Sequence, residues 1–500
     1  MKNPLAILVF SGLLLMACSD DDAVVNPGPG DPDPVEYSSG SADFSNYVAI
    51  GNSLTAGFSD AALFIMGQDA SYPNMLAGSF SAAGGGAFTI PYMADNLGGA
   101  TLGGTPILGN RLILDFSTGS PSPVPVPGQG STEITNTLSG SFNNMGVPGA
   151  KSFHLVAAGY GNVAGVQAGL ANPYYARFAS SPTATVLGDA AGQNPSFFTL
   201  WIGNNDVLSF ATSGGAGTDQ TGNLDPTSYG GNDITDPNVF GSVYNTILQA
   251  MTANGAKGVV ANIPDVTTIP YFTTVPHNPV PLDEATAQLL NGAYAAYNGG
   301  LAQLQALGAL SADELARRTI SFQAGAGNAV VILDEDLTDL TGFNPALINM
   351  RQATAEDLVV LTARSFIGTL ANPQDPTSIN GVAVPLADQW VLTPEEQEAV
   401  VTATAAYNQT IAALAQTYDL GLVDANTYLS TVATTGVTLG DGSVVTAQYG
   451  TGGGFSLDGV HPAPRGYALL ANEFIAVIEA KYGAELPAVD PLAYTGLYIN

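Results

Sequence analysis

The sequence predicts an α/β fold built on a central parallel sheet. Short apolar runs bounded by Gly, Pro or Asn alternate with amphipathic helical patterns, and hydrophobic residues make up 46% of the 500 residues. Short, uninterrupted apolar runs are typical of strands that are covered on both faces. Their alternation with helices favours parallel strands joined by right-handed crossovers.

Four strands and two long helices are expected, in chain order. The strand segments are NYVAIG, SFFTLWIG from Ser196, KGVVANIP from Lys257 and LGLVDA from Leu420. A long helix should follow Thr393, because Thr393 and Glu396 have the spacing of a capping box and Pro394 fits the first helical position. A last helix is expected in PRGYALLANEFIAVIEAKYG, where apolar residues recur at helical spacing.

The first 17 residues have the pattern of a signal peptide. Lys2 precedes an apolar run over residues 5–17 that is too short to span a bilayer. The run ends in LLMAC, which resembles the lipobox of bacterial lipoproteins and contains the only cysteine, Cys18. This resemblance implies a lipidated Cys18 that anchors the mature chain in a membrane. An ordinary cleaved signal peptide is the alternative, and no disulfide can form within the chain.

Residues 18–42 are expected to be an acidic, Pro- and Gly-rich tether. Their acidic start resembles the export signal of some Gram-negative surface lipoproteins, or it is only a solvated tether. We therefore expect an outer-membrane lipoprotein and leave open its exposure at the cell surface. The folded domain is predicted over residues 43–485, with a C-terminal tail over 486–500. Segments 84–140 and 270–388 fit the strand–helix alternation poorly and are predicted as insertions that shape a pocket.

The charge balance excludes one class of partner. The chain has 42 acidic and 11 basic residues, a net charge of −31, which repels nucleic acids and anionic headgroups. Calcium binding by the Asp-rich segment 218–236 is an alternative, but this segment lacks the spacing of an EF-hand loop. We therefore expect no nucleic-acid partner, no metal and no cofactor, and the oligomeric state stays open.

A nucleophile candidate lies in the stretch YVAIGNSLTAGFSD. Ser53 follows an apolar strand and precedes a possible helix, which would place its hydroxyl at a helix N-terminus. The alternative is that Ser53 only caps that helix. The chain has no G-x-S-x-G motif, so the nucleophile elbow of α/β-hydrolases does not apply.

A base for this serine can be sought among only three histidines. His154 lies in a predicted helix, His277 in a Pro-rich loop, and His461 three residues after Asp458. That last spacing lets one loop carry a carboxylate and the imidazole that it orients, although a polar turn before a helix is the alternative.

Donors for an oxyanion are expected near strand ends. LWIGNNDVL ends the second strand, and NNMGVPGAKS is predicted as a loop that opens another helix. Ordinary turn chemistry is the alternative for both segments, because Asn, Gly and Asp are common in turns.

Four segments together resemble the blocks of the SGNH/GDSL hydrolase family. GNSL, NMGVPG, GNND and DGVH occur in the order of the four blocks. The resemblance implies a flavodoxin-like three-layer α/β/α sandwich and an ester hydrolase. It assigns Ser53 as nucleophile, with Asp458 and His461 as its partners. The oxyanion donors implied are Ser53, Gly149 and Asn205, with Gly203 and Asp206 completing the third block.

One position departs from the family. Asn52 stands where the family usually has Asp, although Asn keeps a hydrogen-bond acceptor. The expected function is therefore hydrolysis of carboxylic esters through an acyl-serine intermediate, with acyl lipids and O-acylated glycans both open as substrates. The alternative is an inactive surface-binding lipoprotein on the same fold.

Overall fold

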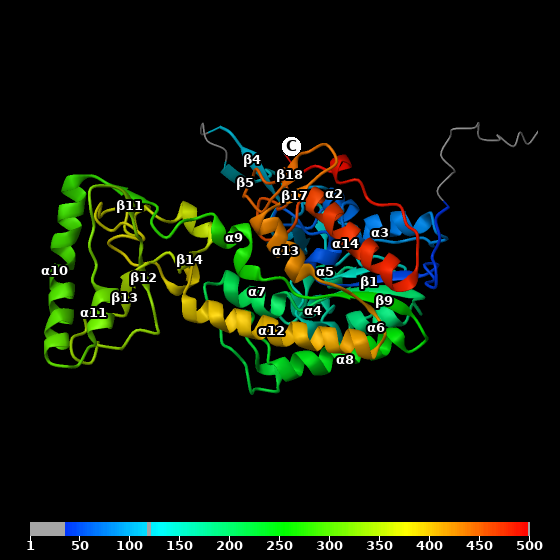
Figure 1. The fold of residues 1–500 in the computed structure, drawn as a ribbon, viewed down its shortest axis with the longest axis horizontal. Helices are drawn as coiled ribbons and strands as arrows, with labels where there is room; N and C mark the ends of the chain where they lie inside the picture. Colours follow the sequence, from blue (N-terminus) through cyan, green and yellow to red (C-terminus); the bar gives the residue numbers. More distant parts are fainter. Residues whose placement is uncertain (1–35, 118–121, 499–500) are drawn as a thin grey trace, which may run out of the picture. The chain divides into compact units, whose positions relative to one another are not determined.

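The computed structural model describes residues 36–117 and 122–498. Its centre is a five-stranded sheet in which every pair of neighbours is parallel (Figure 1). In spatial order the strands are β16 (Gly421–Val423), β9 (Lys257–Ala261), β8 (Phe197–Trp201), β1 (Tyr47–Gly51) and β7 (Asn144–Gly146). The predicted signal peptide and Cys18 lie outside the described residues, as does most of the predicted tether.

The predicted α/β class with a parallel sheet is confirmed, and the four predicted strands are β1, β8, β9 and β16. The prediction for NNMGVPGAKS was wrong in part. Its residues Asn144–Gly146 form the edge strand β7, with Ala49 opposite Asn144, and only a 3-10 turn, η1 (Ser152–Val156), follows. Three residues that begin with a polar side chain give no apolar run for a sequence pattern to detect.

Helices cover both faces of the sheet, which explains why the strands show no polar alternation. Tyr47 and Ala49 face one apolar cluster, and Val48 and Ile50 face the other. The first cluster contains α3 (Tyr72–Ser81) and α14 (Pro464–Tyr482). The second contains α6 (Val186–Ala191), α7 (Asn205–Thr212), α8 (Pro237–Thr252) and α12 (Pro394–Thr417).

The two predicted helices begin where local chemistry placed them. The Thr393 N–H donates to Glu396 Oε2 at 2.6 Å at the start of α12, and Pro394 is its first residue. Helix α14 begins at Pro464 and ends before Gly483, whose φ of +66° is a left-handed cap conformation. None of the helices among the described residues is long and apolar enough to cross a membrane.

Segment 84–140 forms small sheets rather than helices. Strand β2 (Ala100–Leu102) pairs with β3 (Thr105–Leu108) and β6 (Thr132–Glu133), and β4 (Leu112–Asp115) pairs with β5 (Ser122–Pro125). The short helices elsewhere in the first half are α1 (Ser53–Ala56), α2 (Ile65–Asp69), α4 (Val163–Val166), α5 (Pro173–Ala176) and η2 (Pro226–Ser228).

Segment 270–388 has its own helices and strands. In chain order they are α9 (Pro270–Thr273), β10 (Val280–Leu282), α10 (Glu284–Ala306), α11 (Ala312–Arg318), β11 (Gly325–Asn328), β12 (Val331–Leu333), β13 (Met350–Gln352), β14 (Leu358–Val359) and η4 (Leu361–Ser365). Helices α10 and α11 lie with β11, β12 and β13 away from the sheet, at the left of Figure 1. The remaining elements are η3 (Val266–Thr268), η5 (Asp388–Trp390), β15 (Val391–Leu392), α13 (Ala425–Thr434), β17 (Val437–Thr438), β18 (Val444–Val445) and η6 (Pro491–Ala493).

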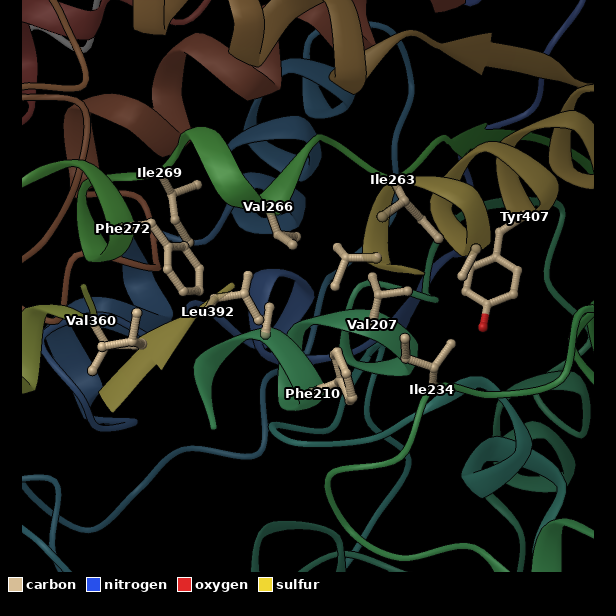
Figure 2. Close-up of a cluster of buried hydrophobic side chains, with 14 of the residues drawn as sticks. Val207, Phe210, Ile234, Ile263, Val266, Ile269, Phe272, Val360, Leu392 and Tyr407 are labelled. Carbon is tan, nitrogen blue, oxygen red and sulfur yellow. The ribbon is translucent and has the colours of Figure 1, made fainter. Parts of the chain in front are cut away.

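The part of segment 270–388 that lies nearest the central sheet shares an apolar core with the sheet domain. Phe272 and Val360 belong to the same buried cluster as Val207 and Ile263, which lie close to the sheet (Figure 2). Because the apolar cluster is continuous, this side of the segment is packed onto the core.

Candidate active site

The carboxyl ends of β1 and β8 are joined by two asparagines. Asn52 Oδ1 accepts the Leu54 N–H at 3.0 Å and so caps α1. Asn52 Nδ2 donates to Asn204 Oδ1 at 2.9 Å, and both side chains are buried. The N-cap of α1 is therefore Asn52, and the alternative interpretation of Ser53 as a cap is wrong. Ser53 is the first residue of the helix, which leaves its hydroxyl free for another partner.

The partner of the Ser53 hydroxyl is His461. Ser53 Oγ and His461 Nε2 are 2.9 Å apart, and His461 Nδ1 and Asp458 Oδ2 are also 2.9 Å apart. The structure thus brings Ser53 together with Asp458 and His461, although Ser53 and His461 are 408 positions apart in the sequence. With the carboxylate holding Nδ1–H, Nε2 is the nitrogen that can accept the serine proton.

The Asp458 carboxylate is surrounded by donors. Its Oδ1 accepts the N–H groups of Val460 and His461, each at 2.8 Å, and the Ser456 hydroxyl at 3.0 Å. Its Oδ2 also accepts the Ala61 N–H at 2.9 Å. Burial raises the pKa of this carboxyl, but His461 and the N–H donors outweigh burial and lower the pKa to about 2. Asp458 is therefore charged at neutral pH, as an imidazolium partner requires.

Several of these supporting residues were missed by sequence reasoning. Asp60 and Ala61 have φ values of +50° and +64°, in the left-handed region that non-Gly residues seldom adopt. This turn brings the Ala61 N–H to Asp458 and the Asp60 N–H to Ser456 Oγ at 3.0 Å. Burial also raises the pKa of Asp60 to about 7. The only sequence trace of the turn is an Asp after GFS, which is too common to interpret.

Two of the predicted oxyanion donors lie on neighbouring segments. Asn205 is the first residue of α7, and its Nδ2 donates one hydrogen to Ala150 O at 2.9 Å. Gly149, the preceding residue, has a φ of +79°, and a Cβ there would meet only Asn172 Nδ2 at 4.0 Å. Glycine is thus required by the backbone angle and not by lack of space.

Three N–H groups on these segments have no acceptor among the described residues. The backbone N–H groups of Ser53 and Gly149 donate to no acceptor. The second hydrogen of Asn205 Nδ2 is likewise uncommitted, and Asn205 lines the same cavity as Ser53. Unpaired N–H donors are what an oxyanion site requires.

Gly203 and Asp206 have structural roles. Gly203 has a φ of +113°, which favours glycine, and a Cβ there would lie 2.6 Å from Ile263 Cδ1 and 2.8 Å from the Phe240 ring. Asp206 is fully buried and accepts the Ser152 N–H at 2.8 Å and its hydroxyl at 2.6 Å. Burial raises the pKa of Asp206, with the Ser152 donors opposing that rise. Asp206 therefore ties η1 to α7 and so holds the Asn205 and Gly149 segments together.

The other two histidines take no part in this site. His154 stacks on Tyr160, and its Nδ1 accepts the Lys151 N–H at 3.0 Å. Burial, with a further contribution from the Lys151 charge, lowers the pKa of His154 to about 4, so it is a neutral, packed side chain. His277 contributes its backbone carbonyl to Val330 N–H.

An apolar cavity opens beside Ser53 and His461. Its volume is about 90 Å³, and it lies between α13, α14 and the loop after β9. None of the described residues that line it is Asp, Glu, Lys or Arg. The lining includes Leu54, Val266, Ile269, Leu429, Val432 and Leu469. Such a lining suits a hydrocarbon group better than a polar one.

Segment 270–388 contacts the loop that carries Asp458 and His461. The Tyr271 N–H donates to Gly459 O at 2.9 Å. A Cβ on Gly459, where φ is +72°, would lie 2.8 Å from Leu361 Cδ2. The loop is thus held from two positions in this segment, while α10 and α11 lie farther away (Figure 1).

The comparisons with known proteins found no match: no family model, no curated protein and no solved structure is similar to this chain. Any function assigned to the site therefore rests on its own chemistry. That chemistry comprises a serine hydroxyl hydrogen-bonded to an imidazole, an ionised carboxylate hydrogen-bonded to the other ring nitrogen, and N–H groups that have no acceptor among the described residues. This combination can carry out acyl transfer to water.

Proposed function

We propose that this chain is a serine ester hydrolase of the SGNH/GDSL type. The observation that carries the proposal is the hydrogen-bonded chain Ser53–His461–Asp458, with both distances at 2.9 Å. His461 Nε2 takes the serine proton as Oγ attacks the ester carbonyl, and it then protonates the departing alcohol. Water activated by the same imidazole releases the acyl group.

The oxyanion of each tetrahedral intermediate is held by N–H donors. They are the backbone N–H groups of Ser53 and Gly149 and the free Asn205 amide hydrogen, all uncommitted among the described residues. Fixed donors aimed at a developing charge make a large contribution to catalysis of this kind.

The sheet topology supports the same proposal. Numbered by chain order, the strands β7-β1-β8-β9-β16 have the order 2-1-3-4-5 of flavodoxin-like sheets, and helices on both faces would complete a three-layer sandwich. In such sheets ligands bind at the carboxyl ends of the strands where the order reverses. Here the reversal falls between β1 and β8, the strands that Ser53 and Asn205 follow.

The cavity favours an ester with a hydrocarbon acyl chain, an acyl lipid, over an O-acetylated sugar. Each CH₂ buried there contributes about 0.8 kcal/mol, so kcat/KM should rise with acyl length until the cavity is filled.

We propose that the enzyme works at the outer membrane, held by a lipidated Cys18. A membrane fraction that retains wild-type protein and loses Cys18→Ser would support this anchoring.

Labelling by a fluorophosphonate tests the activity without knowledge of the natural substrate. The wild-type chain should be labelled and Ser53→Ala should not, whereas Ser81→Ala, which changes an exposed serine of α3, should label normally. A wild-type chain that resists labelling would favour the inactive binding protein instead.

A further inference from the structure

Three carboxylates outside the candidate active site converge on one point. Glu335 follows β12, Asp388 begins η5, and Glu396 lies in the first turn of α12. One oxygen of each lies within 4.8 Å of the corresponding oxygens of the other two. Because these residues come from three separate segments, tertiary packing and not local sequence brings their charges together.

The innermost member, Glu396, has an oxygen without a partner. The residue is 7% exposed, and its Oε2 accepts the Thr393 N–H at 2.6 Å. Its Oε1 is buried and accepts no N–H or hydroxyl donor among the described residues. Gly215 lies directly beside this oxygen, since a Cβ there would be 1.8 Å away. A buried carboxylate oxygen left unpaired is costly unless something else binds it.

No basic side chain in the described part of the chain neutralises this cluster. The nearby acids Asp334 and Asp357 both pair with Arg351. Arg317 reaches Asp334 at 3.6 Å and Glu395 at 3.8 Å, but none of the three converging carboxylates.

Charge repulsion and burial act together on these acids. Burial, with contributions from Glu335 and Asp388, raises the pKa of Glu396 to about 8. Burial and the neighbouring Glu335 also raise the pKa of Asp388 to about 6. Three like charges held within 4.8 Å of one another repel, and a bound cation would remove that repulsion.

We propose that Glu335, Asp388 and Glu396 bind a calcium ion. Carboxylate oxygens are hard ligands, and Ca²⁺ accepts about six to eight oxygens in a flexible geometry. The three oxygens lie within 4.8 Å of one another, which allows one ion to contact all of them. Mg²⁺ usually keeps several waters and takes only one or two carboxylates, so three converging carboxylates favour Ca²⁺. Waters and backbone carbonyls complete the shell.

The ion joins three parts of the fold. Glu335 belongs to segment 270–388, Glu396 begins α12, and Gly214 and Gly215 follow the end of α7. Helix α7 begins with the asparagines beside Ser53, but it is the far end of the helix that lies at the carboxylates. We therefore expect calcium to act on stability, by binding the folded chain and not the unfolded one.

Thermal unfolding of the full chain, freed of metal with a chelator, tests the proposal. Titration with CaCl₂ should raise Tm progressively, by about 2–5 °C at saturating concentration. Asp388→Asn and Glu396→Gln should lose most of this rise. Glu398→Gln makes the same change at an exposed site on the same helix and should keep it. Isothermal titration of the wild type with CaCl₂ should give one site per chain.

Three results would overturn the proposal. The first is a wild-type chain whose Tm and titration heat do not respond to CaCl₂, which would assign the cluster to a shared proton. The second is a calcium response that survives in both Asp388→Asn and Glu396→Gln. The third is an equal or larger response to MgCl₂, which would refute the choice of calcium.

Discussion

Asp458 and Glu396 are both carboxylates in protected positions, yet their surroundings act on them in opposite directions. Asp458 accepts three N–H donors and a hydroxyl beside an imidazole, and its pKa is lowered to about 2. Glu396 accepts one N–H and lies near two other acids, and burial raises its pKa to about 8. Burial favours the neutral acid in both cases, so the neighbouring imidazole and the hydrogen-bond donors decide that Asp458 stays ionised. A carboxylate that accepts several hydrogen bonds stays ionised and can stabilise a positive charge on a neighbouring group.

The largest expected effect comes from removing the groups that Asp458 serves. Ser53→Ala and His461→Ala should each lower ester hydrolysis by at least about 10⁴-fold, because the proposed nucleophile and its proposed base would act as one unit. Initial rates on a p-nitrophenyl ester would measure this, with unchanged Tm values as the control. Substantial turnover by Ser53→Ala would assign catalysis to another residue.

Removing the charge of Asp458 tests directly whether that charge contributes to ester hydrolysis. Asp458→Asn should lower kcat by about 10³–10⁴-fold, because the amide favours the wrong imidazole tautomer and cannot stabilise the imidazolium. The same substitution at Asp388 should leave kcat in calcium-free buffer within about threefold of wild type, since its effect is on stability. Equal losses of kcat in Asp458→Asn and Asp388→Asn would contradict the different roles proposed for the two carboxylates.

A smaller loss is expected from removing one of the proposed oxyanion donors. Asn205→Ala should lower kcat by about 10²–10³-fold, with little change in KM, because the donor acts mainly in the transition state. The variant also leaves Ala150 O without its partner, so a small decrease in Tm is expected. A change in KM alone would assign Asn205 to substrate binding instead.

The pH dependence of stability should separate the two acids. The pKa of Glu396 is about 8 in the folded chain and near 4.5 when unfolded, so its protonation stabilises the fold below about pH 4.5. That contribution is lost as pH rises toward 8. Without calcium, Glu396→Gln should flatten this decline. The lowered pKa of Asp458 contributes stability above about pH 4, which is lost as pH falls toward 2. Urea unfolding at a series of pH values would measure both.

The smallest effect is expected at Asn52. Asn52→Asp should keep the cap on Leu54, because a carboxylate oxygen accepts that N–H equally well. Rotation of the Asn204 amide would restore the bond between the two side chains. Activity should therefore change by less than about tenfold, because both hydrogen bonds of position 52 are kept. A larger gain or loss in kcat would show that this position tunes the chemistry.

The difference between the two sites also explains what the sequence could predict. Asp458 and His461 lie three residues apart on one loop, and β1, β8, β9 and β16 are continuous apolar runs, so both patterns are local. The Ala61 N–H depends on an uncommon backbone turn and leaves no pattern of side chains. Glu396 was predicted as part of a capping box, which explains only its Oε2. Its Oε1 depends on Glu335 and Asp388, which only the folded chain brings near.

The hydrogen bond from Tyr271 N–H to Gly459 O has a consequence for local unfolding. Gly459 lies between the acid and the base of the candidate triad, so an opening that breaks this bond also frees the loop that orients the imidazole. Proteins open in cooperative units, and an amide exchanges its hydrogen with solvent only when its own unit opens. The exchange rate of the Tyr271 amide would therefore report how often segment 270–388 releases the histidine loop. Fraying confined to α10 and α11 would leave that rate unchanged.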